Sequence, residues 1–207
     1  MTVTVEHIAD DIQRRAGDAR RFIVAIAGPP GAGKSTLAER LNSALQARGE
    51  GCAILPMDGF HMDNGILEER GLLKRKGAPE TFDARGFIDI VKAVRAGGEV
   101  LVPVFDRDRE LAICAARAIV PEDRIILVEG NYILLDRAPW NALAPLFDFS
   151  ILVAPSIDEL TRRLTERWTG YKLDEAGIEW KLYGNDLPNG KLVIEESLKP
   201  DLRIEGF

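Results

Sequence analysis

The chain has 207 residues, of which 46% are hydrophobic and 29% are charged. This length suffices for one domain, or one domain with a sizeable insertion, around a buried core. Lys and Arg total 27 against 33 for Asp and Glu, a net charge of −6 that argues against a nucleic-acid backbone as the main partner and favours a small substrate.

Neither the N-terminal segment nor the cysteines point to export. Residues 1–20 carry too many charges for the core of a signal peptide, and no apolar run approaches the length of a membrane span. Cys52 and Cys114 lie in apolar contexts without CxxC spacing, which favours free thiols in a reducing compartment. We therefore expect a cytoplasmic protein without membrane insertion.

The first elements are a helix and a strand. Apolar residues at three- and four-residue steps over 5–16 predict an amphipathic helix that ends at Gly17. The unbroken apolar run 22–27 predicts a buried strand, and a glycine-rich loop follows it. An amphipathic helix is then expected from Lys34 onward.

The loop has the spacing Gly-x-x-x-x-Gly-Lys-Ser and predicts a nucleotide-phosphate site, because strand, loop and helix are the context that phosphate binding requires. Glycines let the backbone curl so that successive N–H groups face an anion. Lys34 would reach the β- and γ-phosphates, and the Ser35 hydroxyl would join the shell of a Mg²⁺ ion. The predicted nucleotide-binding residues are Gly28, Pro29, Pro30, Gly31, Ala32, Gly33, Lys34, Ser35 and Thr36.

A second buried strand, 52–57, ends in Asp58. Ligands of open α/β sheets gather at the carboxyl ends of strands, so Asp58 would face the γ-phosphate and accept a proton from an attacking substrate hydroxyl. An ordinary turn with a capping aspartate is the alternative. His61 could hold substrate or be a structural residue, and the sequence leaves both open.

The connection 64–86 is long and without strong periodicity, which is typical of functional segments. Asp83 could cap the helix that follows it or bind a substrate hydroxyl. A short strand, 100–104, leads into a mixed charge run that predicts a solvated hairpin tip, where Arg107 and Arg109 are minor candidates for substrate contacts.

A third strand, 124–132, is apolar on both faces and contains Glu129 near its end. This is the place where nucleotide-hydrolysing and nucleotide-transferring proteins carry the carboxylate that orients Mg²⁺, usually through water. We expect Glu129 to serve there with Ser35, and to lie beside the substrate.

After a further parallel strand, 149–154, a helix is predicted from Ser156 onward. Leu160, Leu164 and Trp168 form its apolar face, and its arginines lie largely elsewhere. Guanidinium groups bind phosphate oxygens, so residues 160–172 resemble a lid in which Arg163 and Arg167 act on the γ-phosphate. A solvated face with Arg–Glu pairs at helical spacing is the alternative.

The C-terminal part is expected to contain a turn cluster at 185–190 and a last short strand at 191–194. Residues 197–207 show no periodicity. The residue pattern assigns no function to this part.

The order of motifs resembles the phosphoribulokinase, uridine kinase and pantothenate kinase group over about residues 22–167. The segments that carry the resemblance are the loop 28–35, Asp-Gly-Phe-His at 58–61, Arg-Lys-Gly-Ala-Pro-Glu-Thr-Phe-Asp at 75–83, Pro-Val-Phe-Asp at 103–106 and Val-Glu-Gly at 128–130. The chain is most similar to bacterial chains labelled fructose transport system kinases, in which the segments 57–64 and 185–189 have counterparts.

The resemblance implies transfer of the γ-phosphate of MgATP to a small-molecule hydroxyl. Asp58 then matches the catalytic acid of the family, and Asp83 matches the acid that holds substrate hydroxyls in uridine kinases. His61 stands where those enzymes carry a tyrosine. The histidine that helps to recognise uracil has no clear counterpart, because Arg107 and Arg109 occupy that stretch.

Together these observations predict an α/β fold: a P-loop three-layer α/β/α sandwich with a mainly parallel sheet. We expect one kinase domain over 1–207, with substrate-side insertions at 64–86 and 105–118 and the lid at 160–172. The expected activity is ATP- and Mg²⁺-dependent phosphorylation of a sugar, fructose among the candidates, or a similar metabolite. Nucleoside-like or pantothenate-like acceptors and a regulatory P-loop switch are the alternatives, and the resemblance makes a homodimer an expectation.

Overall fold

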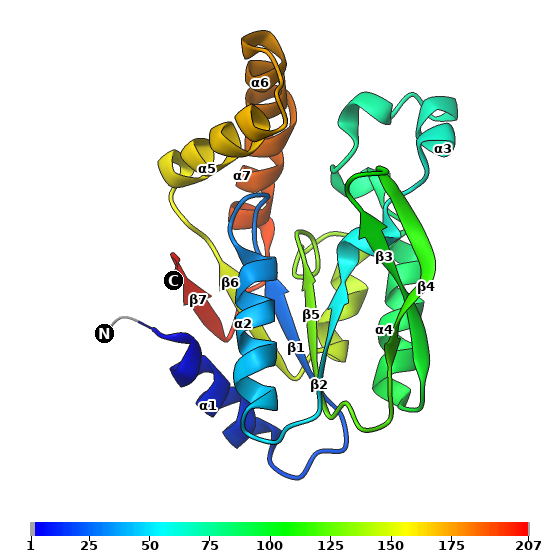
Figure 1. Ribbon diagram of the computed structural model, residues 1–207, viewed down its shortest axis with the longest axis vertical. Helices are drawn as coiled ribbons and strands as arrows, with labels where there is room; N and C mark the ends of the chain where they lie inside the picture. The colour runs from blue at the N-terminus through cyan, green and yellow to red at the C-terminus, as the bar shows by residue number, and fades with distance from the viewer. Residues whose placement is uncertain (1–2, 207) are drawn as a thin grey trace.

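The computed structural model describes residues 3–206 and has a five-stranded parallel sheet at its centre, with strand order β2-β5-β1-β6-β7 (Figure 1). Because β1 lies between β5 and β6, its carboxyl end and the loop after it stand in the middle of the sheet edge. The strands are β1 (Phe22–Ala27), β2 (Cys52–Pro56), β5 (Ile125–Gly130), β6 (Phe149–Val153) and β7 (Leu202–Ile204).

Helices cover both faces of this sheet, as Figure 1 shows. Alternate side chains of β1 point to opposite faces, so Val24 packs in the same cluster as α1 (Val5–Ala16) and α2 (Lys34–Gln46). Ile23 points the other way, toward α4 (Ala84–Ala96) and α7 (Leu187–Glu196). The three-layer α/β/α architecture predicted from the sequence is therefore confirmed.

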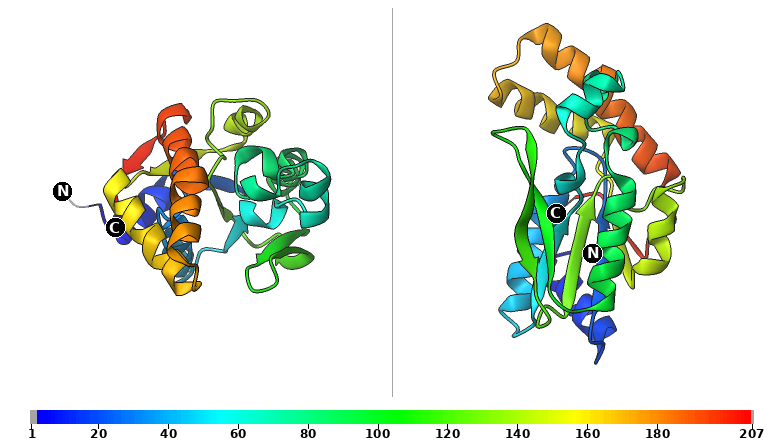
Figure 2. Two further views of the ribbon diagram at one scale, coloured as in Figure 1. Left: turned by 90° about the horizontal axis from the view of Figure 1, so that it is seen from above. Right: turned by 90° about the vertical axis from the view of Figure 1, so that its right-hand side faces the viewer.

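Outside the sandwich, β3 (Val100–Asp106) and β4 (Leu111–Ile119) form an antiparallel hairpin that is separate from the main sheet. Val102 and Ile119 are buried and anchor it, whereas most of β4 is exposed. Figure 2 shows the hairpin beside the sheet, with its tip at the same end of the molecule as α3, α5 and α6. The charged run forms the solvated tip, as predicted.

The remaining helices also gather at the carboxyl end of the sheet. They are α3 (Asn64–Glu69), α5 (Ile157–Gly170) and α6 (Glu175–Lys181). The α5 helix begins as predicted, with the Ser156 hydroxyl accepting a hydrogen bond from the Glu159 amide. Within residues 3–206, no helix combines the length and the apolar character that crossing a membrane demands.

The prediction for residues 185–194 is wrong. In place of a turn cluster and a strand, the chain forms a π-helical turn (Leu182–Asp186) that continues into α7, and the last strand of the sheet is β7. Pro188 is the second residue of α7 and has no N–H to donate to the turn before it. A Cβ atom on Gly190 would lie 3.3 Å from Pro29, so this glycine allows α7 to pack closely against the phosphate loop.

Candidate active site

The glycine-rich loop joins β1 to α2, as its sequence predicts. Gly31 and Gly33 have positive φ angles of 77° and 95°, a conformation that glycine adopts without strain. A Cβ atom on Gly28 would lie 2.4 Å from the Val153 carbonyl oxygen, so β6 leaves no room for a side chain there. The loop amides and the N-terminus of α2, which begins at Lys34, therefore face the space beyond the strand ends.

Lys34 is the central cation of the site and is only 8% exposed. Its Nζ donates a hydrogen bond to the Pro29 carbonyl oxygen at 2.9 Å. Burial lowers the pKa of this ammonium, Glu129 and Asp58 oppose that shift, and the nearby charge of Arg167 adds to it. Lys34 and Arg167 thus bring two positive charges to the same space, which suits an anion such as a terminal phosphate.

Glu129 lies near the end of β5 and is 7% exposed. Burial and the charge of Asp58 raise the pKa of its carboxyl group, while Lys34 and a hydrogen bond with the Ser35 side chain act in the opposite direction. A hydroxyl beside a carboxylate is a donor set that suits Mg²⁺. The described residues contain no cluster of three or more His, Cys, Asp or Glu that could hold a metal alone, so phosphate oxygens and water would have to complete the shell.

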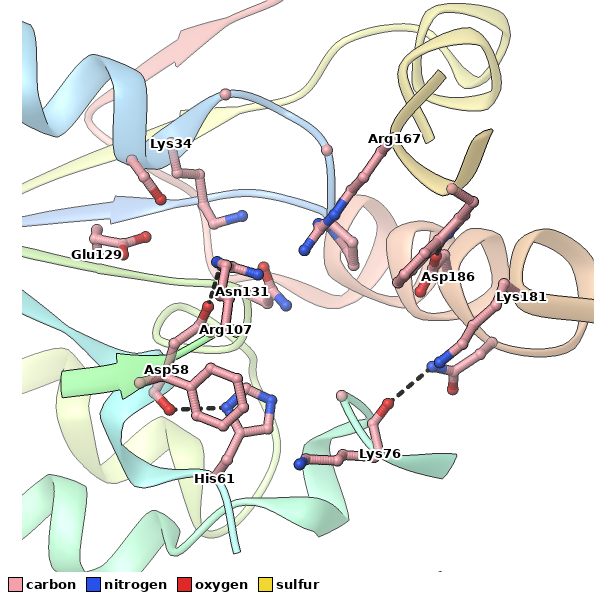
Figure 3. Close-up of a pocket in the computed structure, with 18 of the residues that line it drawn as sticks. Lys34, Asp58, His61, Lys76, Arg107, Glu129, Asn131, Arg167, Lys181 and Asp186 are labelled. Atoms are coloured by element: carbon pink, nitrogen blue, oxygen red, sulfur yellow. Dashed lines mark hydrogen bonds and ion pairs between the residues drawn. The ribbon is translucent and has the colours of Figure 1, made fainter. Parts of the chain in front are cut away.

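Asp58 lies in the tight turn that follows β2. Its Oδ2 atom pairs with the Arg107 guanidinium at 2.7 Å, and the two side chains are 27% and 48% exposed. The next residue, Gly59, brings the turn against β3, because a Cβ atom there would lie 2.4 Å from the Pro103 carbonyl oxygen. This close packing places the hairpin tip over Asp58 (Figure 3).

His61 is a neutral residue in an aromatic stack. Its ring lies 4.1 Å from the Phe82 ring and 4.6 Å from the Phe105 ring. The Nδ1 atom is 2.8 Å from the backbone oxygen of Asp58, and since a carbonyl only accepts, Nδ1 carries the proton. Burial lowers the pKa of His61. The ring thus supports the Asp58 turn and also lines the cavity beside it.

These groups surround a cavity of about 330 Å³ at the carboxyl end of the sheet. The structure brings ten of the sequence-predicted site residues to its wall: Pro30, Gly31, Gly33, Lys34, Ser35, Thr36, Asp58, His61, Glu129 and Arg167. One cavity therefore contains the predicted phosphate-binding groups and the predicted base. Gly28, Pro29 and Ala32 lie behind the wall, where the carbonyl groups of Pro29 and Ala32 accept hydrogen bonds from cations.

Three further predicted residues, which lie outside the phosphate loop, do not line the cavity either. Asp83 caps α4, with Oδ1 accepting a hydrogen bond from the Gly86 amide at 2.9 Å. This is the helix-capping contact that the sequence offered as one of two alternatives. Arg109 is 71% exposed at the hairpin tip and lies 3.6 Å from the Asp106 carboxylate. Arg163 donates to the Ala32 carbonyl oxygen at 3.0 Å, which places it behind the phosphate loop.

Several cavity residues were not predicted as site residues. They are Lys76, Gly77, Phe105, Glu110, Asn131, Trp168, Lys181, Asn185 and Asp186. Lys76 lies in the 75–83 motif, and Asn185 and Asp186 lie in the 185–189 segment. Their place in these motifs was the sequence feature that could have identified them as site residues. Arg107, which also lines the cavity, was only a minor candidate for a substrate contact, because runs of charged residues are usually exposed to solvent.

Known proteins with similar sequences include several that are kinases by name. The model of the phosphoribulokinase/uridine kinase family matches residues 23–173. "Uncharacterized protein YggC" of Escherichia coli is 35% identical over 90% of this chain and 78% of its own length. "Putative uridine kinase C227.14" of Schizosaccharomyces pombe is 30% identical over 95% of this chain and 89% of its own length. A pantothenate kinase of Leifsonia xyli is 30% identical, but the match spans 53% of that protein.

Two solved structures are similar to this chain. The "putative fructose transport system kinase" from Silicibacter sp. TM1040 is 40% identical, with a TM-score of 0.92 over 97% of this chain and 98% of that one. YFH7 from Saccharomyces cerevisiae shares the fold, with a TM-score of 0.83 at 19% identity. The chain belongs to the phosphoribulokinase/uridine kinase family of P-loop kinases, whose members use ATP to phosphorylate hydroxyl groups of small molecules.

Proposed function

We propose that the protein transfers the γ-phosphate of ATP to a hydroxyl of a sugar or similar polyol, with fructose as one candidate. The observation that carries the proposal is the arrangement of Lys34, Glu129 and Asp58 around one cavity (Figure 3). A phosphate-binding cation and a carboxylate at the end of the next strand are the donor and acceptor halves of a transfer site.

On the donor side, the loop amides and Lys34 bind the phosphates of the nucleotide. Ser35, together with Glu129 through water, would hold Mg²⁺, which supplies positive charge that neutralises the phosphate oxygens. Arg167 approaches the same space from α5, and Arg163 supports the loop from behind through the Ala32 carbonyl. In this proposal residues 160–172 act as a lid that keeps water from the γ-phosphate.

On the acceptor side, Asp58 orients the substrate hydroxyl and takes its proton as the oxygen attacks the γ-phosphorus. The bond from that phosphorus to the bridging oxygen breaks, and the electron pair leaves with ADP. Arg107 already lies on Asp58 at 2.7 Å. When its guanidinium turns toward the transferred phosphoryl group, it stabilises the charge there and frees the carboxylate for the hydroxyl.

The lining of the acceptor side supports a neutral polyol. Asp58, Glu110 and Asp186 line the cavity, and Arg107 pairs with Asp58 while Lys76 pairs with Glu110, so the protein itself balances these charges and an acceptor needs no net charge. Amide and ammonium donors lie beside these acceptors, and a hydroxyl is the substrate group that satisfies both kinds of partner. The name of the Silicibacter protein points to a sugar, and the segments 64–86 and 105–118 supply the walls for it.

The test is acceptor-dependent ADP release. The purified protein is incubated with MgATP and, in turn, fructose, other hexoses and pentoses, uridine and pantothenate. The proposal expects a sugar to accelerate ADP release and to yield a phosphorylated product by mass spectrometry. If only uridine or pantothenate accelerates ADP release, the acceptor is a compound of that kind and not a sugar. If no hydroxyl compound accelerates ADP release, a regulatory P-loop switch is favoured over a kinase.

A further inference from the structure

The end of the cavity opposite Asp58 is formed by the π-helical turn between α6 and α7 (Figure 3). Asp186 is the last residue of this turn, is 7% exposed and lines the cavity. π-Helical turns occur frequently at functional sites, because they interrupt the regular hydrogen-bond pattern of a helix. A buried carboxylate at this place requires a physical reason.

The two carboxylate oxygens of Asp186 have different surroundings. Oδ2 accepts a hydrogen bond from the Trp168 indole nitrogen at 2.7 Å. Oδ1 has no hydrogen-bond partner in the part of the chain that the structure describes. The indole thus holds the carboxylate in place, while one oxygen remains available to a donor inside the cavity. Because Oδ1 is accessible from the cavity, a hydroxyl of the substrate could take the place of water on it.

The neighbouring groups select the kind of donor. The Lys181 ammonium lies 5.0 Å from the centre of the Trp168 ring, and its charge acts on Asp186. Asn185 is held to the opposite wall, donating from Nδ2 to the Lys76 carbonyl oxygen at 3.1 Å. A phosphate or carboxylate of the substrate would be repelled by Asp186, whereas a hydroxyl can donate to Oδ1 and accept from the ammonium.

We infer that Asp186 is a specificity-determining residue that accepts a hydrogen bond from a second hydroxyl of the acceptor, remote from the one that is phosphorylated. The inference rests on the proposed kinase function and deepens it. An acceptor must then present hydroxyls to Asp58 and Asp186 at once, so a monosaccharide meets the requirement and a simple alcohol does not. Because Trp168 follows Arg167 in α5, the same hydrogen bond also holds the lid helix against the acceptor end of the cavity.

The test compares a sugar with its singly deoxygenated derivatives. With wild-type protein, removal of the hydroxyl that reaches Asp186 should lower kcat/KM about 10- to 100-fold, as expected for a hydrogen bond to a charged group. Asp186→Asn keeps an oxygen for Trp168 but loses the charge, so its discrimination against that same derivative should fall to about threefold or less. The KM for ATP should be unchanged.

Three further variants separate recognition from folding. Trp168→Phe removes the indole donor and should raise the acceptor KM about tenfold without changing the KM for ATP. Trp180→Phe is the matched control, because Trp180 is 43% exposed and should behave as wild type. The side-chain amide of Asp186→Asn could still bind the hydroxyl, so Asp186→Ala is measured as well. This variant should also lose discrimination against the deoxy derivative, and circular dichroism checks that it is folded.

The outcomes separate this inference from the function on which it rests. If the wild-type protein phosphorylates sugars and the Asp186 variants discriminate against every deoxy derivative as the wild type does, the role of Asp186 is refuted and the kinase function stands. If the wild-type protein phosphorylates no hydroxyl compound, both are refuted. Loss of discrimination at one hydroxyl position supports both.

Discussion

Replacing Arg107 by alanine should damage catalysis far more than stability. The guanidinium lies at the tip of the β3–β4 hairpin and pairs with Asp58 at 2.7 Å. It also lines the cavity that contains Lys34, so it can reach a transferred phosphoryl group. The variant removes this charge from the site and leaves the buried anchor of the hairpin, Val102 and Ile119, in place.

The two effects can be estimated separately. The paired side chains of Arg107 and Asp58 are 48% and 27% exposed, so solvent screens the pair and its loss should cost no more than about 1 kcal/mol. For a domain of this size that lowers Tm by about 2–4 °C at most. Loss of one preorganised charge that stabilises the transition state typically costs about 10²- to 10³-fold in kcat. We expect that loss in kcat, with the KM for ATP changed much less.

The assay is acceptor-dependent ADP release, with thermal unfolding of the same samples. Arg109→Ala is the matched control, because it removes an arginine from the same hairpin tip that does not line the cavity and is 71% exposed. It should retain wild-type kcat, and a raised acceptor KM in this variant would support the sequence-based expectation of a substrate contact at Arg109. An Arg107→Ala protein with kcat within about threefold of wild type would refute the reasoning.

Other predictions follow from single contacts. Asp83→Ala removes the cap of α4 and should cost about 1 kcal/mol of stability while the acceptor KM stays unchanged; a raised KM with unchanged Tm would instead restore its substrate role. Burial lowers the pKa of His61, so the unfolded state binds the proton more readily, and stability should be lost as pH falls below about 6.5. His61→Asn, which can still donate to the Asp58 carbonyl, should lose less Tm than wild type between about pH 7.5 and about pH 5.5; equal losses would contradict a neutral, buried His61. Burial raises the pKa of the Cys52 thiol to about 12, whereas Cys114 is exposed, so a disulfide reagent should label one thiol of the native protein and both after denaturation. Rapid labelling of Cys52 in the native protein would show that β2 opens readily.

The sequence predicted the strands around the phosphate loop well, because each is an apolar run that both layers of helices cover. The same reasoning placed Lys34, Asp58 and Glu129 together, since the carboxyl ends of parallel strands share one edge. These predictions depended only on local sequence patterns, because parallel strands that end at one edge of a sheet bring their terminal residues together.

The C-terminal part could not be predicted in this way. Asn, Asp, Pro and Gly between 185 and 190 favour a turn by local propensity, but tertiary contacts stabilise a helix instead. Asn185 and Asn189 are each 2% exposed and bond to each other at 3.2 Å, and Gly190 packs against the phosphate loop. The contact of Gly190 with Pro29 and the hydrogen bond from Asn185 to the Lys76 carbonyl oxygen join residues that lie far apart in the sequence.

Trp168 shows a second limit. Its spacing from Leu160 and Leu164 predicts an apolar helix face, and those two leucines are indeed buried. The indole, however, lines the cavity and donates to Asp186. Helical periodicity places a side chain on a face and does not tell whether that face continues past the core into a site.

The most direct test of the central claim compares wild type with Asp58→Asn. The claim is that Asp58 receives the proton of the attacking hydroxyl while Lys34 and the loop hold the nucleotide. Acceptor-stimulated ADP release should fall about 10²- to 10⁴-fold in the variant, while the Kd for ATP stays within about threefold of wild type. A variant that releases ADP at the wild-type rate in the presence of acceptor would contradict the assignment.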